Sequence, residues 1–171
     1  MDRSEKSVET SMQVIGAYIE ATVGAGGTYA LPHPKGKSMY PVINPATDTV
    51  LLAAPTNIEL FDAILFRRKN GAYVLHRVIG QKKGAYTVCG DNQILPETVS
   101  PEHIVAKLVG IKRQKDGKEI VIDINDASYR KNIRRLHRKK LPKRLYYRLR
   151  HIIASAIRAL PGCKEFGRKK S

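Results

Sequence analysis

Residues 63–89 read AILFRRKNGAYVLHRVIGQKKGAYTVC, a stretch in which β-rich runs alternate with turn signals. The dipeptide Asn70-Gly71 is among the strongest hairpin signals, because both residues readily adopt the positive φ angles of a two-residue turn. A second break, at Lys82-Lys83-Gly84, leads into the next run. The stretch therefore predicts three strands joined by hairpin turns, over Ala63–Arg68, Ala72–Ile79 and Ala85–Cys89.

The same pattern continues on both sides of this stretch. Short β-rich runs occupy Thr49–Ala54, Ile104–Arg113 and Glu119–Ile124, and Asp116-Gly117 supplies a turn signal between the last two. Many short strands with a turn every 8–12 residues or so are typical of a mainly β fold. We therefore predict a mainly β domain over residues 35–125.

Helical patterns flank this β domain. Apolar residues recur at near-helical spacing over residues 5–22, which predicts a short N-terminal helix, followed by a Gly- and Pro-rich linker up to residue 34. From residue 126 to residue 171 we expect a basic helical tail. Pro142 is predicted to begin a helix there and Pro161-Gly162 to end it. The apolar face of this helix is predicted to hold Leu145, Leu149, Ile152, Ile153, Ala156 and Leu160.

The charge of the chain is concentrated in that tail. The 171 residues are 42% hydrophobic and 27% charged, an ordinary globular composition, and the net charge is +16. Residues 130–171 hold 16 Lys or Arg and one acid, whereas residues 1–129 hold 15 Lys or Arg and 14 acids. A nearly neutral body thus carries a strongly basic tail, and the question of partners concerns the tail.

Several classes of protein are excluded by composition. Two cysteines, Cys89 and Cys163, are too few for a disulfide scaffold, and no histidine lies at metal-ligand spacing from another ligand. We therefore expect neither a metal nor a cofactor. The longest weakly charged stretch, residues 10–34, is interrupted by Gly and Pro, so we expect neither a membrane span nor a secretory signal peptide. These features favour a cytoplasmic protein.

Three local motifs in the β domain carry chemistry. They are a loop (Gly36-Lys37-Ser38-Met39-Tyr40-Pro41), a strand segment (Leu75-His76-Arg77-Val78) and a turn (Gly90-Asp91-Asn92). Each alone is an ordinary turn or strand sequence. Together they supply a hydroxyl, a base to remove its proton and an acid to orient that base, as a serine hydrolase requires. The candidate catalytic residues are Ser38, His76 and Asp91.

In this order, with a hydrophobic strand after Asp62 between the first two, the motifs resemble those of the S24/S26 serine peptidases. That superfamily includes the type I signal peptidases and the self-cleaving LexA-like repressors. The resemblance covers roughly residues 36–113. It implies a coiled-sheet β domain and a serine endopeptidase that cleaves a peptide or precursor protein, with Ser38 as the nucleophile.

The base distinguishes two branches of the superfamily. Bacterial signal peptidases and LexA-like proteins place a Lys where this chain has His76, whereas the endoplasmic-reticulum and archaeal-type signal peptidases place a His there, with an Asp downstream. The chain resembles this second, Ser-His-Asp branch, with Asp91 as the matching acid. Glu97 stands near the place of a further Asp of that branch, so either carboxylate is a candidate for orienting the base. Gly36 replaces a Ser that helps to bind the oxyanion in many signal peptidases, which leaves the backbone N–H of Ser38 as the expected donor.

The basic tail suggests partners of its own. Its apolar face and its cations suit an anionic membrane surface, which predicts peripheral attachment at the inner face; alternatively, the same apolar face packs on the β domain. Nucleic acid is the weaker hypothesis, because aromatic residues are not interleaved apart from Tyr146-Tyr147 and only about 35 residues precede the Ser38 loop, too few for a three-helix DNA-binding module. A regulatory LexA-like protein and an inactive peptidase homologue are the alternative functions.

Overall fold

The computed structural model of the chain describes residues 3–159. Two helices bracket a set of short strands and one 3₁₀ turn. In chain order the elements are α1 (Arg3–Gly24), β1 (Tyr29–Pro32), β2 (Asp48–Ala53), β3 (Ala63–Arg67), β4 (Tyr73–Lys82), β5 (Ala85–Cys89), β6 (Glu97–Val99), η1 (Pro101–His103), β7 (Ile104–Lys115), β8 (Lys118–Ile122) and α2 (Ala127–Ala159).

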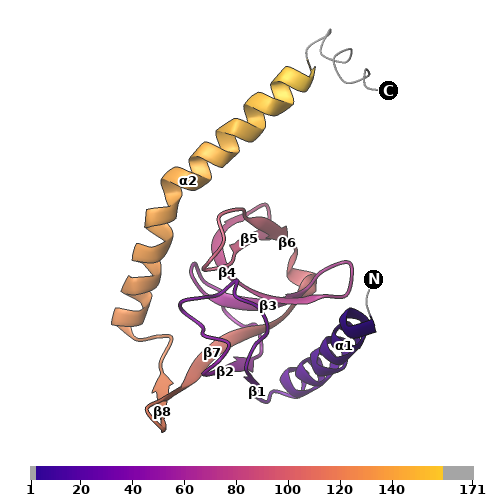
Figure 1. Ribbon diagram of the computed structural model, residues 1–171, viewed down its shortest axis with the longest axis vertical. Helices are drawn as coiled ribbons and strands as arrows, with labels where there is room; N and C mark the ends of the chain where they lie inside the picture. Colours follow the sequence, from indigo (N-terminus) through magenta and orange to yellow (C-terminus); the bar gives the residue numbers. More distant parts are fainter. Residues whose placement is uncertain (1–2, 160–171) are drawn as a thin grey trace.

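The eight strands form one antiparallel sheet, visible at the centre of Figure 1. The strand order is β1-β2-β7-β3-β4-β5-β6, and β8 pairs with β7. The predicted mainly β class and the predicted N-terminal helix are therefore confirmed. The central position of β3 and β4 places the His76 motif in the interior of the sheet rather than at its edge.

The hairpins lie where the turn signals predicted them, although at Asn70-Gly71 only Gly71 has a positive φ angle, of 84°, and the turn is longer than two residues. Between β4 and β5, Lys83 and Gly84 have φ angles of 51° and 78°. Between β7 and β8, Asp116 and Gly117 have φ angles of 52° and 73°. Two successive positive φ angles give a turn whose twist matches that of the flanking strands, which is why these dipeptides join neighbouring strands of the sheet.

The main hydrophobic core joins α1 to the sheet and to the Ser38 loop. From α1, Ile19 and Val23 are buried against the sheet residues Val50 and Leu52. The same cluster contains Met39, the neighbour of Ser38 in the chain. A second cluster lies around Phe66 and extends over β3, β4, β5 and β6. No helix among residues 3–159 has the length and apolar character that a membrane span requires.

The helix α2 begins earlier than we predicted. It begins at Ala127, and Pro142, which we predicted to begin a helix, lies inside it. The carboxylate of Asp126 accepts hydrogen bonds from the backbone N–H groups of Ser128 and Tyr129 at 2.8 and 3.1 Å, which caps the helix at this earlier point. In Figure 1 the helix changes direction about midway along its length, as expected of a helix with an internal proline.

Two short strands were not predicted. β1 lies in the segment that we expected to be a linker, and β6 follows the Gly90-Asp91-Asn92 turn. These are the two strands at the ends of the strand order, each with a single partner strand. The predicted end of the C-terminal helix at Pro161-Gly162, and Leu160 on its apolar face, lie outside the described residues.

Candidate functional site

The nucleophile candidate, Ser38, is held in a tight loop between β1 and β2. Gly36 has a φ angle of 88°, and the N–H of Ile43 donates to the carbonyl of Met39 at 2.9 Å. Met39 and Ile43 are buried in the main core, while Ser38 itself is half-buried. The two apolar neighbours therefore anchor the loop, while Ser38 stays partly accessible to solvent.

His76 reaches the same region from the middle of the sheet. It lies on β4, opposite Ile64 of β3, and is only 2% exposed. Its ring packs at a tilt against Phe66, with 6.0 Å between ring centroids. Burial lowers the pKa of His76, because the protonated ring loses hydration, and the negative charge of Glu97 offsets part of this effect. The ring is therefore poised in its neutral, basic form.

Ser38 and His76 line one cavity of about 260 Å³. The sequence-predicted nucleophile and base thus come together from segments 38 residues apart in the chain. Among the described residues no hydrogen bond joins the two side chains, and such contacts are often long before substrate binds. The other lining residues are Pro34, Lys35, Gly36, Met39, Ile43, Arg68, Tyr73, Val74, Leu75 and Gln93.

Glu97 is the carboxylate beside His76. Its Oε1 atom lies 2.7 Å from Nδ1 of His76. The oxygen lies off the axis of the ring N–H, so the two groups are in contact without an aligned hydrogen bond. Arg68 holds the same carboxylate through two bonds, of 3.0 Å from Nε and 2.8 Å from Nη2. Partial burial favours the neutral acid, but Arg68 and then His76 outweigh it and lower the pKa of Glu97.

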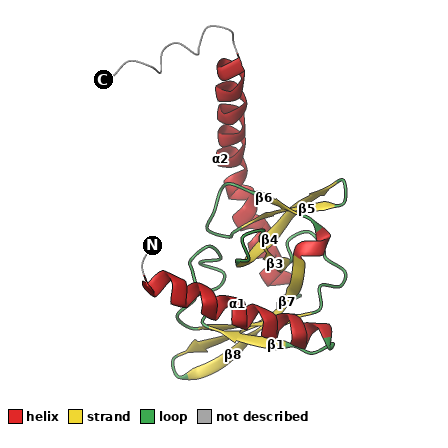
Figure 2. Ribbon diagram, turned by 90° about the vertical axis from the view of Figure 1, so that its right-hand side faces the viewer, coloured by secondary structure: helices red, strands yellow, loops and turns green. Residues whose placement is uncertain are grey.

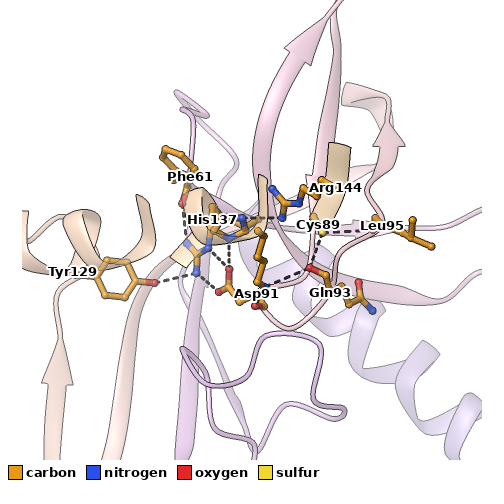
Figure 3. A network of polar contacts seen from close by, with 10 residues as sticks. Phe61, Cys89, Asp91, Gln93, Leu95, Tyr129, His137 and Arg144 are labelled. Atoms are coloured by element: carbon orange, nitrogen blue, oxygen red, sulfur yellow. Dashed lines mark hydrogen bonds and ion pairs between the residues drawn. The ribbon is translucent and has the colours of Figure 1, made fainter. Parts of the chain in front are cut away.

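Asp91 has different partners. Arg77 donates two hydrogen bonds to the carboxylate of Asp91, from Nε at 2.8 Å and from Nη2 at 2.7 Å. Nε2 of His137 lies 2.7 Å from the Oδ1 atom of Asp91 (Figure 3). Asp91 and Arg77 are each 1% exposed. Burial alone would raise the pKa of Asp91, but the Arg77 guanidinium outweighs it and keeps that pKa below its usual value. Of the two acids left open by the sequence, the one in contact with His76 is therefore Glu97.

The Gly90-Asp91-Asn92 turn nevertheless belongs to the candidate site, because it supports the Ser38 loop. The N–H of Asn92 donates to the carbonyl of Ser38 at 2.7 Å. A Cβ atom on Gly90 would lie 2.6 Å from that same carbonyl oxygen, closer than real Cβ atoms approach. Glycine is therefore required here to let the two loops meet.

Residues of α2, outside the β domain, pack against the Gly90-Asp91-Asn92 turn. Arg144 donates from Nη2 to Nδ1 of His137 at 3.0 Å, so Nδ1 is the acceptor and Nε2 carries the proton donated to Asp91. Lys140 contacts the carbonyl of Asp91 and lies 3.4 Å from that of Gln93. Sequence reasoning missed these contacts. The one signal in the sequence was the spacing of His137, Lys140 and Arg144, which places the three side chains on one face of a helix.

No group of three or more metal-ligating side chains lies together in the part of the chain that the structure describes. Cys89 is buried next to the turn, and burial raises the pKa of its thiol. Its Sγ atom lies 3.4 Å from the carbonyl of Gln93 (Figure 3), so the thiol serves as a packed donor rather than as an exposed nucleophile. The chemistry available at this site is therefore that of a hydroxyl, an imidazole and a carboxylate.

Comparisons with models of protein families, with curated proteins and with solved structures found no match to this chain.

Proposed function

We propose that this chain is a serine endopeptidase of the S24/S26 type, similar to a signal peptidase, that cleaves a peptide or precursor protein. One observation carries the proposal: the hydroxyl-bearing loop of Ser38 and the buried imidazole of His76 line the same cavity. The contact of Glu97 with Nδ1 of the ring supports it, because the negative charge of the carboxylate favours a proton on Nδ1 and thus the basic lone pair on Nε2.

The reaction divides into two steps. Nε2 of His76 takes the proton of the Ser38 hydroxyl while Oγ bonds to the carbonyl carbon of the scissile peptide. The imidazolium then gives that proton to the leaving amine, the C–N bond breaks, and an acyl-enzyme remains. Water, deprotonated by His76, hydrolyses this ester and restores Ser38. The negative charge of Glu97 stabilises the imidazolium in both steps.

The oxyanion of each tetrahedral intermediate needs a hydrogen-bond donor. Within residues 3–159 the backbone N–H of Ser38 has no hydrogen-bond acceptor, which leaves it available for this role. Gly36 offers no side-chain hydroxyl as a second donor. Because loss of one oxyanion donor typically slows catalysis by about 10²–10³-fold, we expect turnover at the slow end of the serine peptidase range.

Assignment to the S24/S26 superfamily rests on the order of the three motifs and on their convergence. The loop of Ser38, the strand of His76 and the Gly90-Asp91-Asn92 turn are separate in sequence and are neighbours in an antiparallel sheet domain. Arg77, the residue after the proposed base, is ion-paired with Asp91 of the third motif. This pairing explains in physical terms why the second and third motifs occur together.

Replacement of the nucleophile tests the proposal. We expect Ser38→Ala to lower cleavage of a peptide library by at least about 10⁴-fold, because the other hydroxyl that lines the cavity, that of Tyr73, donates to Glu20 at 2.7 Å. Cleavage products are read by mass spectrometry, and a thermal melt shows that the fold is retained. Ser100→Ala is the matched control, because the Ser100 side chain makes no cap hydrogen bond to the 3₁₀ turn it precedes. Equal cleavage by the Ser38→Ala protein would refute the assignment.

A further inference from the structure

From Leu141 onward, α2 presents a row of apolar side chains to solvent. Leu141, Leu145, Leu149 and Ile153, here called the α2 stripe, are between 49% and 59% exposed. Their spacing of four residues places them in one slowly winding row on the helix surface. Four large apolar side chains exposed side by side on one element are unusual for a surface that meets only water.

Positive charge surrounds the α2 stripe. Arg138, Lys139, Lys143 and Arg150 are exposed on the same part of the helix. The whole of α2, residues 127–159, contains no Asp or Glu. The helix therefore combines an apolar row with exposed cations on its other faces, and no acid within it reduces the positive potential.

The α2 stripe cannot fold back onto the β domain without breaking buried contacts. The same four-residue row begins with Ile133 and His137, which are buried against the domain, and His137 bridges Asp91 and Arg144 there. Figure 2 shows the helix continuing away from the sheet beyond this attachment. The first half of α2 thus fixes the direction in which the second half projects.

We propose that the α2 stripe binds the surface of an anionic lipid membrane, with its Leu and Ile side chains in the headgroup–acyl boundary and its Lys and Arg side chains on lipid phosphates. Charge complementarity selects an anionic surface, and the apolar row selects lipid over nucleic acid. Phosphates of nucleic acid would use the cations alone and leave the leucines in water. Exposed Tyr146 is of a residue type that favours the interface of a bilayer.

The test is co-sedimentation of the full chain with vesicles of phosphatidylcholine containing about one third phosphatidylglycerol, against vesicles of phosphatidylcholine alone. We expect binding to the anionic vesicles only. The double variant Leu145→Gln/Leu149→Gln should weaken it by about 10-fold or more, because two apolar side chains lose their burial in lipid. The control Leu60→Gln/Val121→Gln changes two comparably exposed apolar residues of the β domain and should bind like the unaltered chain.

A second pair of variants tests the electrostatic part. Lys143→Gln/Arg150→Gln should weaken vesicle binding, whereas Lys115→Gln/Lys118→Gln, exposed on the β domain, should not. Binding should also fall between about 0.02 M and about 0.5 M salt, as the Debye length shortens. The Ser38→Ala protein should bind vesicles fully, which separates this proposal from the proposed peptidase activity.

Three results would overturn the membrane assignment. One is equal binding to both kinds of vesicle, and another is full binding by the Leu145→Gln/Leu149→Gln protein. The third is tighter binding to a random DNA duplex than to anionic vesicles, unaffected by the two leucine replacements, which would assign the helix to nucleic acid instead.

Discussion

The two carboxylates near the site have different surroundings, and the surroundings assign their roles. Asp91 lies in a buried ion pair with Arg77, which also donates to the carbonyl of Phe61 at 2.8 Å. Removing one member of a buried ion pair leaves an uncompensated charge in a medium of low polarity. Glu97 is half-buried and contacts the proposed base. We infer that Asp91 maintains the structure around the site and that Glu97 acts on His76.

Two substitutions separate these roles. Asp91→Asn should destabilise the fold by about 3–5 kcal/mol, because Arg77 loses its counter-charge. Glu97→Gln should leave the melting temperature within a few degrees and lower kcat/KM by about 10-fold or more, because the imidazolium loses its stabilising charge. Glu102→Gln, an exposed glutamate on η1, is the control for both. A stable but inactive Asp91→Asn protein would instead make Asp91 the acid that orients His76.

The pH dependence of activity should report His76. A general base works only when it is unprotonated, and burial places the pKa of His76 below its usual value of about 6.5. Activity should therefore persist at pH 6.5 and fall only as the pH drops through that lowered pKa. Glu97 raises the His76 pKa, so in Glu97→Gln the acid limb should move to still lower pH. The profile of kcat/KM measures both, and a limb above pH 7 would point to a different base.

At the scale of elements, local turn chemistry made part of the fold predictable from sequence. The central hairpins follow from dipeptides such as Lys83-Gly84, whose positive φ angles depend on the residues themselves. The edge strands β1 and β6 were missed for the opposite reason. They are four and three residues long, and what makes them strands is pairing with β2 and β5, which no local pattern encodes.

The site divides in the same way. Ser38 and His76 were predicted because each lies in a local motif, and the structure brings them to one cavity. The partner of His76 was left open between two acids, since the choice depends on how β6 places Glu97. The contact of His137 with Asp91 spans 46 residues and joins a helix to a turn. The sequence indicated that His137 lies on a helix, but it did not indicate which part of the β domain that helix would contact.

The start of α2 illustrates how tertiary contacts override a local rule. Proline is favoured in the first turn of a helix, which made Pro142 a reasonable predicted start. The structure extends the helix back to Ala127 because its first half buries Ile133 against the domain and is capped by Asp126. Most helix stability in proteins comes from such packing, which outweighs the hydrogen bond that an internal proline removes.

At the scale of the whole molecule, one part of α2 packs against the β domain and the other part is exposed to solvent. Its first half reaches the buried Arg77–Asp91 pair, and through the Gly90-Asp91-Asn92 turn it supports the loop of Ser38. Residues 141–159 carry the exposed apolar row and five of the 31 Lys and Arg residues of the chain. Composition places the boundary between the β domain and the basic tail at residue 126. The charge of the chain changes there, but the first part of the tail still packs against the β domain.

Two truncations should reveal where the structural unit ends. A chain that ends after Leu145 keeps His137, Lys140 and Arg144, so it should melt within a few degrees of the full chain and cleave a short soluble peptide at the same rate.

A chain that ends after Asp126 loses the hydrogen bond of His137 to a charged carboxylate, about 1.5–3 kcal/mol, and the burial of Ile133, about 1.5–3 kcal/mol more. At about 2–4 °C per kcal/mol for a chain of this size, its melting temperature should fall by roughly 6 °C or more. Its cleavage rate should fall as well, since the turn that holds the Ser38 carbonyl loses its outer support. A thermal melt and a peptide assay on both proteins measure this, with His137→Ala in the full chain expected to lie between them. Equal melting of the two truncated proteins would show that the β domain is complete without α2.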